Sequence, residues 1–167
     1  SVTIPNSVTY IGYSVFKGCS SLTTVNWNAT TCPSAGSHYE PIFEGCPNLA
    51  IVNIGDNVKI IPSGVFFGCT GLTNVTIGNS VMSIDSWAFD GCTGLTNITI
   101  PDSVTSIGHS AFHGCTGITS VTIPDSGTSI GDYGFDGCTR LSSIIIPDSV
   151  TNIGKDAFRN TAWYNNQ

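Results

Sequence analysis

Phenylalanine recurs along this chain at a fixed interval of 23 residues. The six members of this series are Phe43, Phe66, Phe89, Phe112, Phe135 and Phe158, and Phe16 precedes them by 27 residues. A cysteine lies three residues after each of the first six phenylalanines, counting from Phe16. A period of this length is typical of a solenoid, in which each repeat is one coil that neighbouring coils bury. We therefore predict a single array of about seven coils over residues 1–167.

The most regular repeat, residues 95–117, reads Leu-Thr-Asn-Ile-Thr-Ile-Pro-Asp-Ser-Val-Thr-Ser-Ile-Gly-His-Ser-Ala-Phe-His-Gly-Cys-Thr-Gly. Residues 95–100 are rich in Thr and β-branched side chains, and Ile98 and Ile100 alternate with Thr99, which predicts a strand with one buried face. The Pro-Asp-Ser that follows is typical of a turn. Residues 110–112 are compatible with one helical or 3₁₀ turn that Gly114 closes with a positive φ. Each coil should therefore contain one short parallel strand and a side made of turns.

The second repeat, residues 28–50, departs from this regularity. It contains four additional residues between Trp27 and Phe43, rich in Ser, Gly and Pro. We interpret this insertion as a protruding loop.

The seven cysteines do not form the pattern of a disulfide framework. Six share one repeat position and should stack in a column with coils ~4.8 Å apart. Parallel Cβ atoms at that spacing exceed the ~3.5–4.5 Å separation that a disulfide prefers, so we expect buried thiols. Cys32 stands outside the column, and a disulfide with Cys46 remains the alternative for it.

The charge and hydropathy of the chain indicate which kinds of partner it is unsuited to bind. Five basic and eleven acidic residues give a net charge of −6, which argues against a nucleic-acid-binding protein. No apolar run approaches the ~20 residues of a membrane helix. The chain starts and stops within a repeat and has no secretory signal at Ser1. We therefore expect a piece of a longer protein.

The repeat Ile-Pro-Asp-Ser-Val-Thr-Ser-Ile-Gly-x-x-Ala-Phe-x-Gly-Cys-Thr-Gly-Leu-Thr-x-Val-Thr-Ile resembles the BspA-like leucine-rich repeat, over the span from Ile4 to about Phe158. The resemblance implies a right-handed α/β solenoid with a parallel sheet on its concave face. It also implies an extracellular or cell-surface protein that adheres to proteins or glycans of a host or of neighbouring cells. The last repeat departs from the pattern: Asn160-Thr161 replaces Gly-Cys, and Trp163-Tyr164 resembles a terminal cap or the transition to a different domain.

The solvent face of the strands is the candidate binding surface, because solenoids commonly bind along such a ladder. The predicted contact residues are Asn74, Thr76, Asn97, Thr99, Ser120 and Thr122, with Tyr39 in the loop as a second contact. The alternative is that these uncharged residues only keep the sheet soluble, since the face lacks the aromatic and Arg anchors of strong interfaces.

Other candidate sites have weaker support. His113 with Asp90 and Asp136 suggests a zinc site, but an exposed charge ladder between coils explains them better. The recurring Asp102, Asp125 and Asp148 suggest calcium ligands, but turn capping explains them better. Cys32, His38 and Glu40 lie close in sequence on a loop, which makes a poor catalytic site. We therefore predict no catalytic, cofactor-binding or metal-binding residues.

Two function classes remain once the candidate sites have been weighed. The first is a surface module that binds or adheres to other molecules. The second is a structural protein whose open end coils stack head to tail into a fibre, a form of homo-oligomer.

Overall fold

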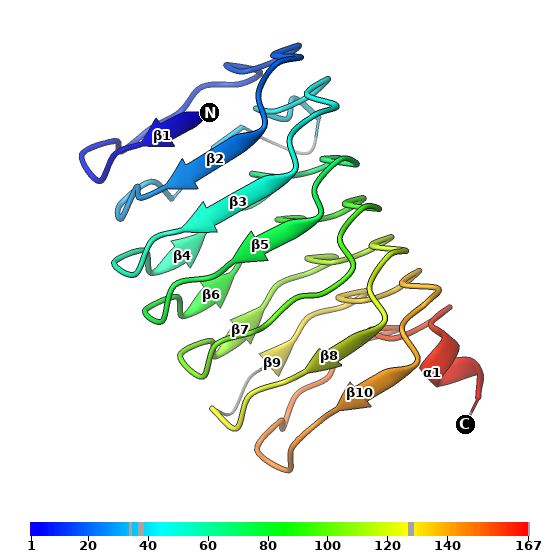
Figure 1. Cartoon of the computed structure of the whole chain (residues 1–167). Coiled ribbons are helices and arrows are strands. Elements are labelled where there is room, and N and C mark those ends of the chain that lie inside the picture. Colours follow the sequence, from blue (N-terminus) through cyan, green and yellow to red (C-terminus); the bar gives the residue numbers. More distant parts are fainter. Residues whose placement is uncertain (34, 37–38, 127–128, 167) are drawn as a thin grey trace.

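The computed structural model of this protein describes residues 1–33, 35–36, 39–126 and 129–166. The chain winds into a solenoid of parallel strands with a period of about 23 residues (Figure 1). One row of strands consists of β1 (Val2–Ile4), β2 (Thr24–Trp27), β3 (Ile51–Ile54) and β5 (Asn74–Thr76), which pair in that order, followed by the separate pair β8 (Ser120–Thr122) and β10 (Ser143–Ile145). The register advances by one repeat per strand, as in Val25↔Val52↔Val75. The predicted fold class is confirmed.

Each regular coil carries a second short strand that the sequence analysis did not predict. These strands are β4 (Ile60–Ile61), β6 (Ser83–Ile84), β7 (Ser106–Ile107) and β9 (Ser129–Ile130), and they pair in that order. Their buried isoleucines were predicted as core, but not as members of a sheet. Coils stacked in register bring every extended segment against its copy, so two-residue segments can also pair. The predicted number of strands, one in each coil, was therefore too low for these coils.

The stretch with the best strand pattern is the one that breaks the sheet. Residues 96–100 form no strand, and Figure 1 shows plain trace between β5 and β8. Buried Ile98 and Ile100 still alternate with exposed Asn97 and Thr99. The prediction of which side chains face the core is therefore confirmed, whereas the prediction of a strand at these residues is wrong. A missing proline N–H does not by itself explain this break. Gly55 donates its backbone N–H to Trp27 O at 2.9 Å, and Pro101 at the same repeat position has no N–H to donate. Pro147 also lacks one, yet β10 before it pairs with β8.

The phenylalanine series forms the continuous core of the solenoid. Neighbouring rings from Phe16 to Phe158 stack with centroids 5.1–5.7 Å apart and interplanar angles of 6–16°. Trp163, on helix α1 (Ala162–Asn165), packs edge-on against Phe158 at 5.5 Å. Thr161 caps this helix by accepting a hydrogen bond from Tyr164 N. Trp163 therefore covers the last ring of the phenylalanine column.

All seven cysteines are thiols, so the alternative disulfide between Cys32 and Cys46 is not formed. Within the column, Cys92, Cys115 and Cys138 donate to the phenylalanine carbonyl of the preceding coil at 3.0–3.2 Å. Burial raises the pKa of Cys69 and of Cys138 from 9.0 to about 12. Cys19, predicted to be buried with the others, is exposed, because it lies in the first coil and only one side of that coil is covered.

Hydrogen-bonded turns complete each coil. The predicted turn around residues 110–112 is present as successive turns closed by bonds between residues three apart, such as His113 N to Ser110 O at 3.1 Å. In the part of the chain that the structure describes, no helix is long and apolar enough to span a membrane.

Candidate functional site

The predicted contact residues lie exposed on the row of strands that includes β5 and β8. All six side chains are exposed, and they alternate with the buried Val75, Ile98 and Val121. Three successive coils supply two contact residues each. The period-two prediction for this face is therefore confirmed, whereas its role in binding remains a prediction.

Polar side chains on the first coils of this face satisfy one another. Asn26 Nδ2 donates to Thr3 Oγ1 at 3.3 Å, and Asn53 Nδ2 donates to Asn26 Oδ1 at 2.9 Å. Among the described residues, no such bond continues to Thr76 or Thr99. Asn97 Nδ2 donates only to its neighbour Thr96, at 3.3 Å. Unused hydrogen-bonding capacity therefore concentrates on the coils of β5, of residues 96–100 and of β8.

Two grooves flank the unpaired segment 96–100. The first lies between this segment and β5 and has a volume of about 690 Å³; Asn74, Thr76 and Thr99 are among its lining residues. The second lies between the segment and β8, with a volume of about 400 Å³, and is lined by the other three predicted residues together with Thr99. The broken ladder thus gathers all six predicted residues around two adjacent grooves. Sequence reasoning identified these residues without finding the grooves.

Tyr39, the predicted second contact, is 84% exposed in the irregular second repeat. It lines neither groove. Ala29, Ala35 and Ile42 anchor this repeat in the core. In the suggested catalytic grouping, Cys32 is buried, and His38 lies outside the described residues.

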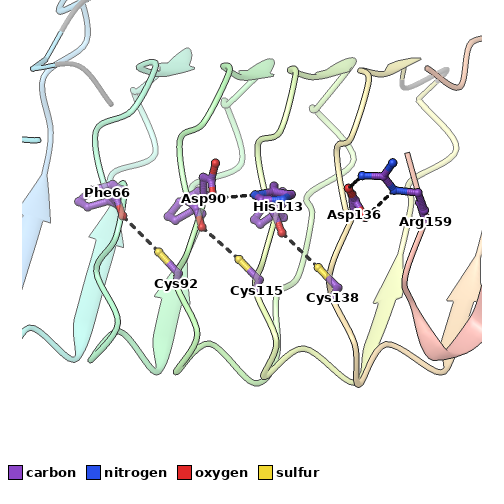
Figure 2. A network of polar contacts seen from close by, with 10 residues as sticks. Phe66, Asp90, Cys92, His113, Cys115, Asp136, Cys138 and Arg159 are labelled. Atoms are coloured by element: carbon purple, nitrogen blue, oxygen red, sulfur yellow. Dashed lines mark hydrogen bonds and ion pairs between the residues drawn. The ribbon is translucent and has the colours of Figure 1, made fainter. Parts of the chain in front are cut away.

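Carboxylates join neighbouring coils through specific partners, as Figure 2 shows. His113 Nδ1 lies 3.0 Å from Asp90 Oδ1. Arg159 Nη2 donates to Asp136 Oδ2 at 2.7 Å, and Asn160 Nδ2 donates to Asp136 Oδ1 at 3.0 Å. The predicted ladder of His113 with Asp90 and Asp136 is instead two separate pairs, because Asp136 bonds Arg159 and Asn160. Asp136 is only 2% exposed, so the expectation of an exposed ladder was wrong at this residue. The side-chain hydrogen bond to Asp136 raises the pKa of Arg159.

Two metal-site hypotheses remain without support. No group of three His, Cys, Asp or Glu side chains converges among the residues that the structure describes. Asp102, Asp125 and Asp148 are exposed at their turns. The aspartates that cap backbone N–H groups are different ones: Asp132 accepts from Lys155 N at 2.7 Å, and Asp56 accepts from Asn79 N at 3.3 Å.

An aromatic row on the turn side was missed by the sequence reasoning. His109 lies edge-to-face between Trp87, at 5.2 Å, and Tyr133, at 5.6 Å. The Arg159 guanidinium lies 5.4 Å from the Tyr133 ring centroid. Trp87 and Tyr133 share a repeat position and have φ of 57°. The only available signal was that two aromatic residues occupy that position, one repeat on either side of Ser110.

Comparisons with known proteins agree with this architecture. The model of the BspA type Leucine rich repeat region matches in six copies over residues 1–92 and 37–165. A leucine-rich repeat protein of T. pallidum superposes with a TM-score of 0.80 at 26% identity, covering 97% of this chain and 76% of that protein. A comparison with curated proteins finds no match.

Two further solved structures are similar over part of their length. A leucine-rich repeat protein of Bacteroides ovatus is 29% identical with a TM-score of 0.61, covering 96% of this chain and 49% of that one. A leucine rich cell surface protein of Faecalibacterium prausnitzii is 27% identical with a TM-score of 0.54, covering 94% of this chain and 57% of that one. This protein belongs to the BspA-type leucine-rich repeat family.

Proposed function

We propose that this protein is a cell-surface or secreted binding module, which contacts proteins or glycans of a host or of neighbouring cells through the face of β5, residues 96–100 and β8. The observation that carries the proposal is the concentration of exposed Asn, Thr and Ser side chains around two grooves, with no side-chain bond from them to a neighbouring coil among the described residues. A surface location is supported by the likeness to the Faecalibacterium prausnitzii cell surface protein.

The same surface argues for binding rather than catalysis. Asp102 is the only ionisable side chain that lines either groove, so the grooves lack an acid–base pair for proton transfer. Few aromatic or Arg anchors are present, so binding by this chain alone should be weak, with a Kd of about micromolar or higher.

End-to-end stacking is the less supported function. The first coil does expose Tyr10, Tyr13 and Val15. At the other end, however, α1 places Trp163 against the last ring of the phenylalanine column. A head-to-tail contact needs two complementary open ends, and here one of them is covered.

The test is a charge change on the proposed face. Asn74, Asn97 and Ser120 are replaced together by Lys, and binding to immobilised extracellular-matrix proteins and to host-type cells is measured. The matched control replaces three residues exposed on the turn after the cysteine column, Thr70, Thr93 and Thr139, by Lys. Both variants gain three charges and should keep the wild-type melting temperature. Loss of binding in the first variant alone supports the proposal, whereas equal binding by both contradicts it.

A further inference from the structure

The aromatic row of Trp87, His109 and Tyr133 is a feature that the proposed function does not use. All three side chains are partly exposed, and Trp and Tyr anchor many protein interfaces. Trp87 and Tyr133 each have a φ of 57°, which bulky residues rarely adopt. Gly64 and Ser110 occupy the same repeat position in other coils, so the fold does not require a ring there. Backbone strain of this kind is typical of functional positions.

The row already contacts one guanidinium. Arg159, from the next coil, lies 5.4 Å from the centroid of the Tyr133 ring, a distance at which a cation and an aromatic ring attract each other. Its Nη2 also donates a hydrogen bond to Asp136 Oδ2 at 2.7 Å. An aromatic ring and a carboxylate of one coil therefore hold an Arg side chain that comes from outside that coil.

The same ring and carboxylate recur two coils earlier. Trp87 and Asp90 occupy the repeat positions of Tyr133 and Asp136, and Trp is the best aromatic partner for a cation. The repeat position of Arg159 is taken by His113, whose Nδ1 lies 3.0 Å from Asp90 Oδ1. The Asp90 side chain is 15% exposed, against 3% for Asp136. The coil of Trp87 therefore repeats the guanidinium site, with its carboxylate more accessible to solvent.

The charge of the surrounding coils favours a cationic partner. Residues 60–139 contain six Asp and no Lys or Arg, whereas the rest of the chain contains five acidic and five basic residues. The net charge of −6 therefore comes entirely from the part of the chain that carries the row. Asp132 directly precedes Tyr133, and Asp85 lies two residues before Trp87. A surface with charges of one sign attracts a partner of the opposite sign.

We propose that the aromatic row is a second docking surface, on which a partner protein places an Arg side chain from an exposed basic segment over the ring of Trp87. The contact copies the one that Arg159 makes with Tyr133. Arg suits it because a planar guanidinium stacks on aromatic faces. The row follows β6, β7 and β9 in the chain, so this surface is separate from the face of β5 and β8 and does not depend on the proposed function.

The probe is the peptide acetyl-Gly-Arg-Gly-Arg-Gly-Arg-amide, titrated at low ionic strength into the isotope-labelled protein and followed by NMR. The side-chain signals of Trp87, His109 and Tyr133 should shift and saturate with a Kd of about 1 mM. Those of Trp27, which is buried, should stay unchanged. The control peptide contains citrulline, an uncharged analogue of similar shape, in place of Arg, and it should cause no shift.

Two pairs of Asp→Asn substitutions separate a specific site from general attraction. Asp85→Asn with Asp132→Asn removes two carboxylates beside the row. Asp102→Asn with Asp125→Asn removes two exposed carboxylates from the turns that join the two rows of strands. Both variants have the same net charge, so long-range attraction weakens equally. The first should raise the Kd severalfold more than the second.

A third variant tests the ring itself. Trp87→Gly places there the residue found in Gly64, which adopts a positive φ without strain. It should raise the Kd about two- to fivefold, the contribution of an exposed cation–π contact. Ser110→Gly, at the same repeat position, is the matched control and should bind as wild type does.

The outcomes decide the proposal clearly. A larger effect of Asp85→Asn with Asp132→Asn, together with a loss of affinity in Trp87→Gly, supports it. Equal effects of the two Asp→Asn pairs would mean that the peptide responds only to overall charge, which contradicts the proposed site. Equal binding of the citrulline peptide, an unchanged Kd in Trp87→Gly, or no shift at several millimolar peptide also contradicts it.

Discussion

Removing one ring from the phenylalanine column tests whether this column holds the solenoid together. Phe112 has no exposed surface and stacks on Phe89 at 5.3 Å and on Phe135 at 5.1 Å. A buried Phe side chain covers ~150–250 Å², which at ~25 cal/mol per Å² corresponds to ~4–6 kcal/mol as an upper value. Phe→Ala substitutions in cores cost ~3–5 kcal/mol. We therefore expect Phe112→Ala to lower the free energy of unfolding by ~4 kcal/mol.

The control is Phe16→Ala, because Phe16 is half-buried and has a single ring partner, Phe43, at 5.3 Å. Its cost should be about half as large, ~1–2 kcal/mol. Urea unfolding followed by circular dichroism measures both values. Hydrogen exchange should show that Phe112→Ala loosens the two flanking coils most, since each coil contacts only its neighbours. A loss below about 1 kcal/mol for Phe112→Ala, or equal losses for the two variants, would refute the reasoning.

Three further predictions concern the thiols and the buried carboxylate. A maleimide reagent should label Cys19 rapidly in the native protein and all seven cysteines only after denaturation; rapid native labelling of several would contradict burial. The pKa of Cys69 and of Cys138 is raised to about 12 by burial, so the unfolded state ionises first. Between pH 9 and 12 each of these two thiols should therefore lower the free energy of unfolding by ~1.4 kcal/mol for each unit that the pH rises. Replacing Cys69 and Cys138 together by Ala should make the free energy of unfolding, measured by urea titration, depend less steeply on pH. Arg159→Ala should lower the free energy of unfolding in urea titrations, because the buried Asp136 loses its charged partner, and adding Asp136→Asn should restore part of the loss if the pair is coupled.

The features that could be predicted from the sequence are those that repeat. Phe112 and Cys115 recur at one interval, and stacking of identical side chains places them in the core without further information. The exposed positions Asn97 and Thr99 follow from period-two alternation in the same way. The resemblance of the repeat to a known family then added the parallel sheet and the binding role.

The features that were missed depend on contacts between particular coils. The Asp136–Arg159 bond joins residues one repeat apart, in the same column where Lys17 pairs with Glu44 and Asp90 pairs with His113. The alternation of opposite charges in this column was the available signal, and Arg159 was overlooked in it. The gap at residues 96–100 is harder still, because Thr-Asn-Ile-Thr-Ile differs from the paired Thr-Asn-Val-Thr-Ile of residues 73–77 by one methylene group. The strand residues themselves therefore do not determine the pairing, and the cause must lie in the adjoining turn or in the neighbouring coils.

The turn after the strand supplies a testable cause. Gly55 and Gly78 stack so closely that a Cβ on Gly78 would lie 2.5 Å from Gly55 O, whereas Pro101 both lacks an N–H and needs room for its ring. Pro101→Gly should restore a donor towards Ile77 O and slow amide exchange at residues 97–100. Melting temperature is the wrong readout, because replacing Pro by Gly also costs ~0.4–1 kcal/mol through the entropy of the unfolded chain.

The matched control for this change is Pro147→Gly, next to a ladder that is already closed by Ile123 N and Ile145 O at 3.0 Å. It removes the same ring and carries the same entropic cost, but it should leave exchange in β8 unchanged. If Pro101→Gly slows exchange at residues 97–100, a single turn residue keeps these amides unpaired. If exchange there stays fast, proline is not the cause, and the packing of Ile98 and Ile100 against the core must hold the segment away from β5.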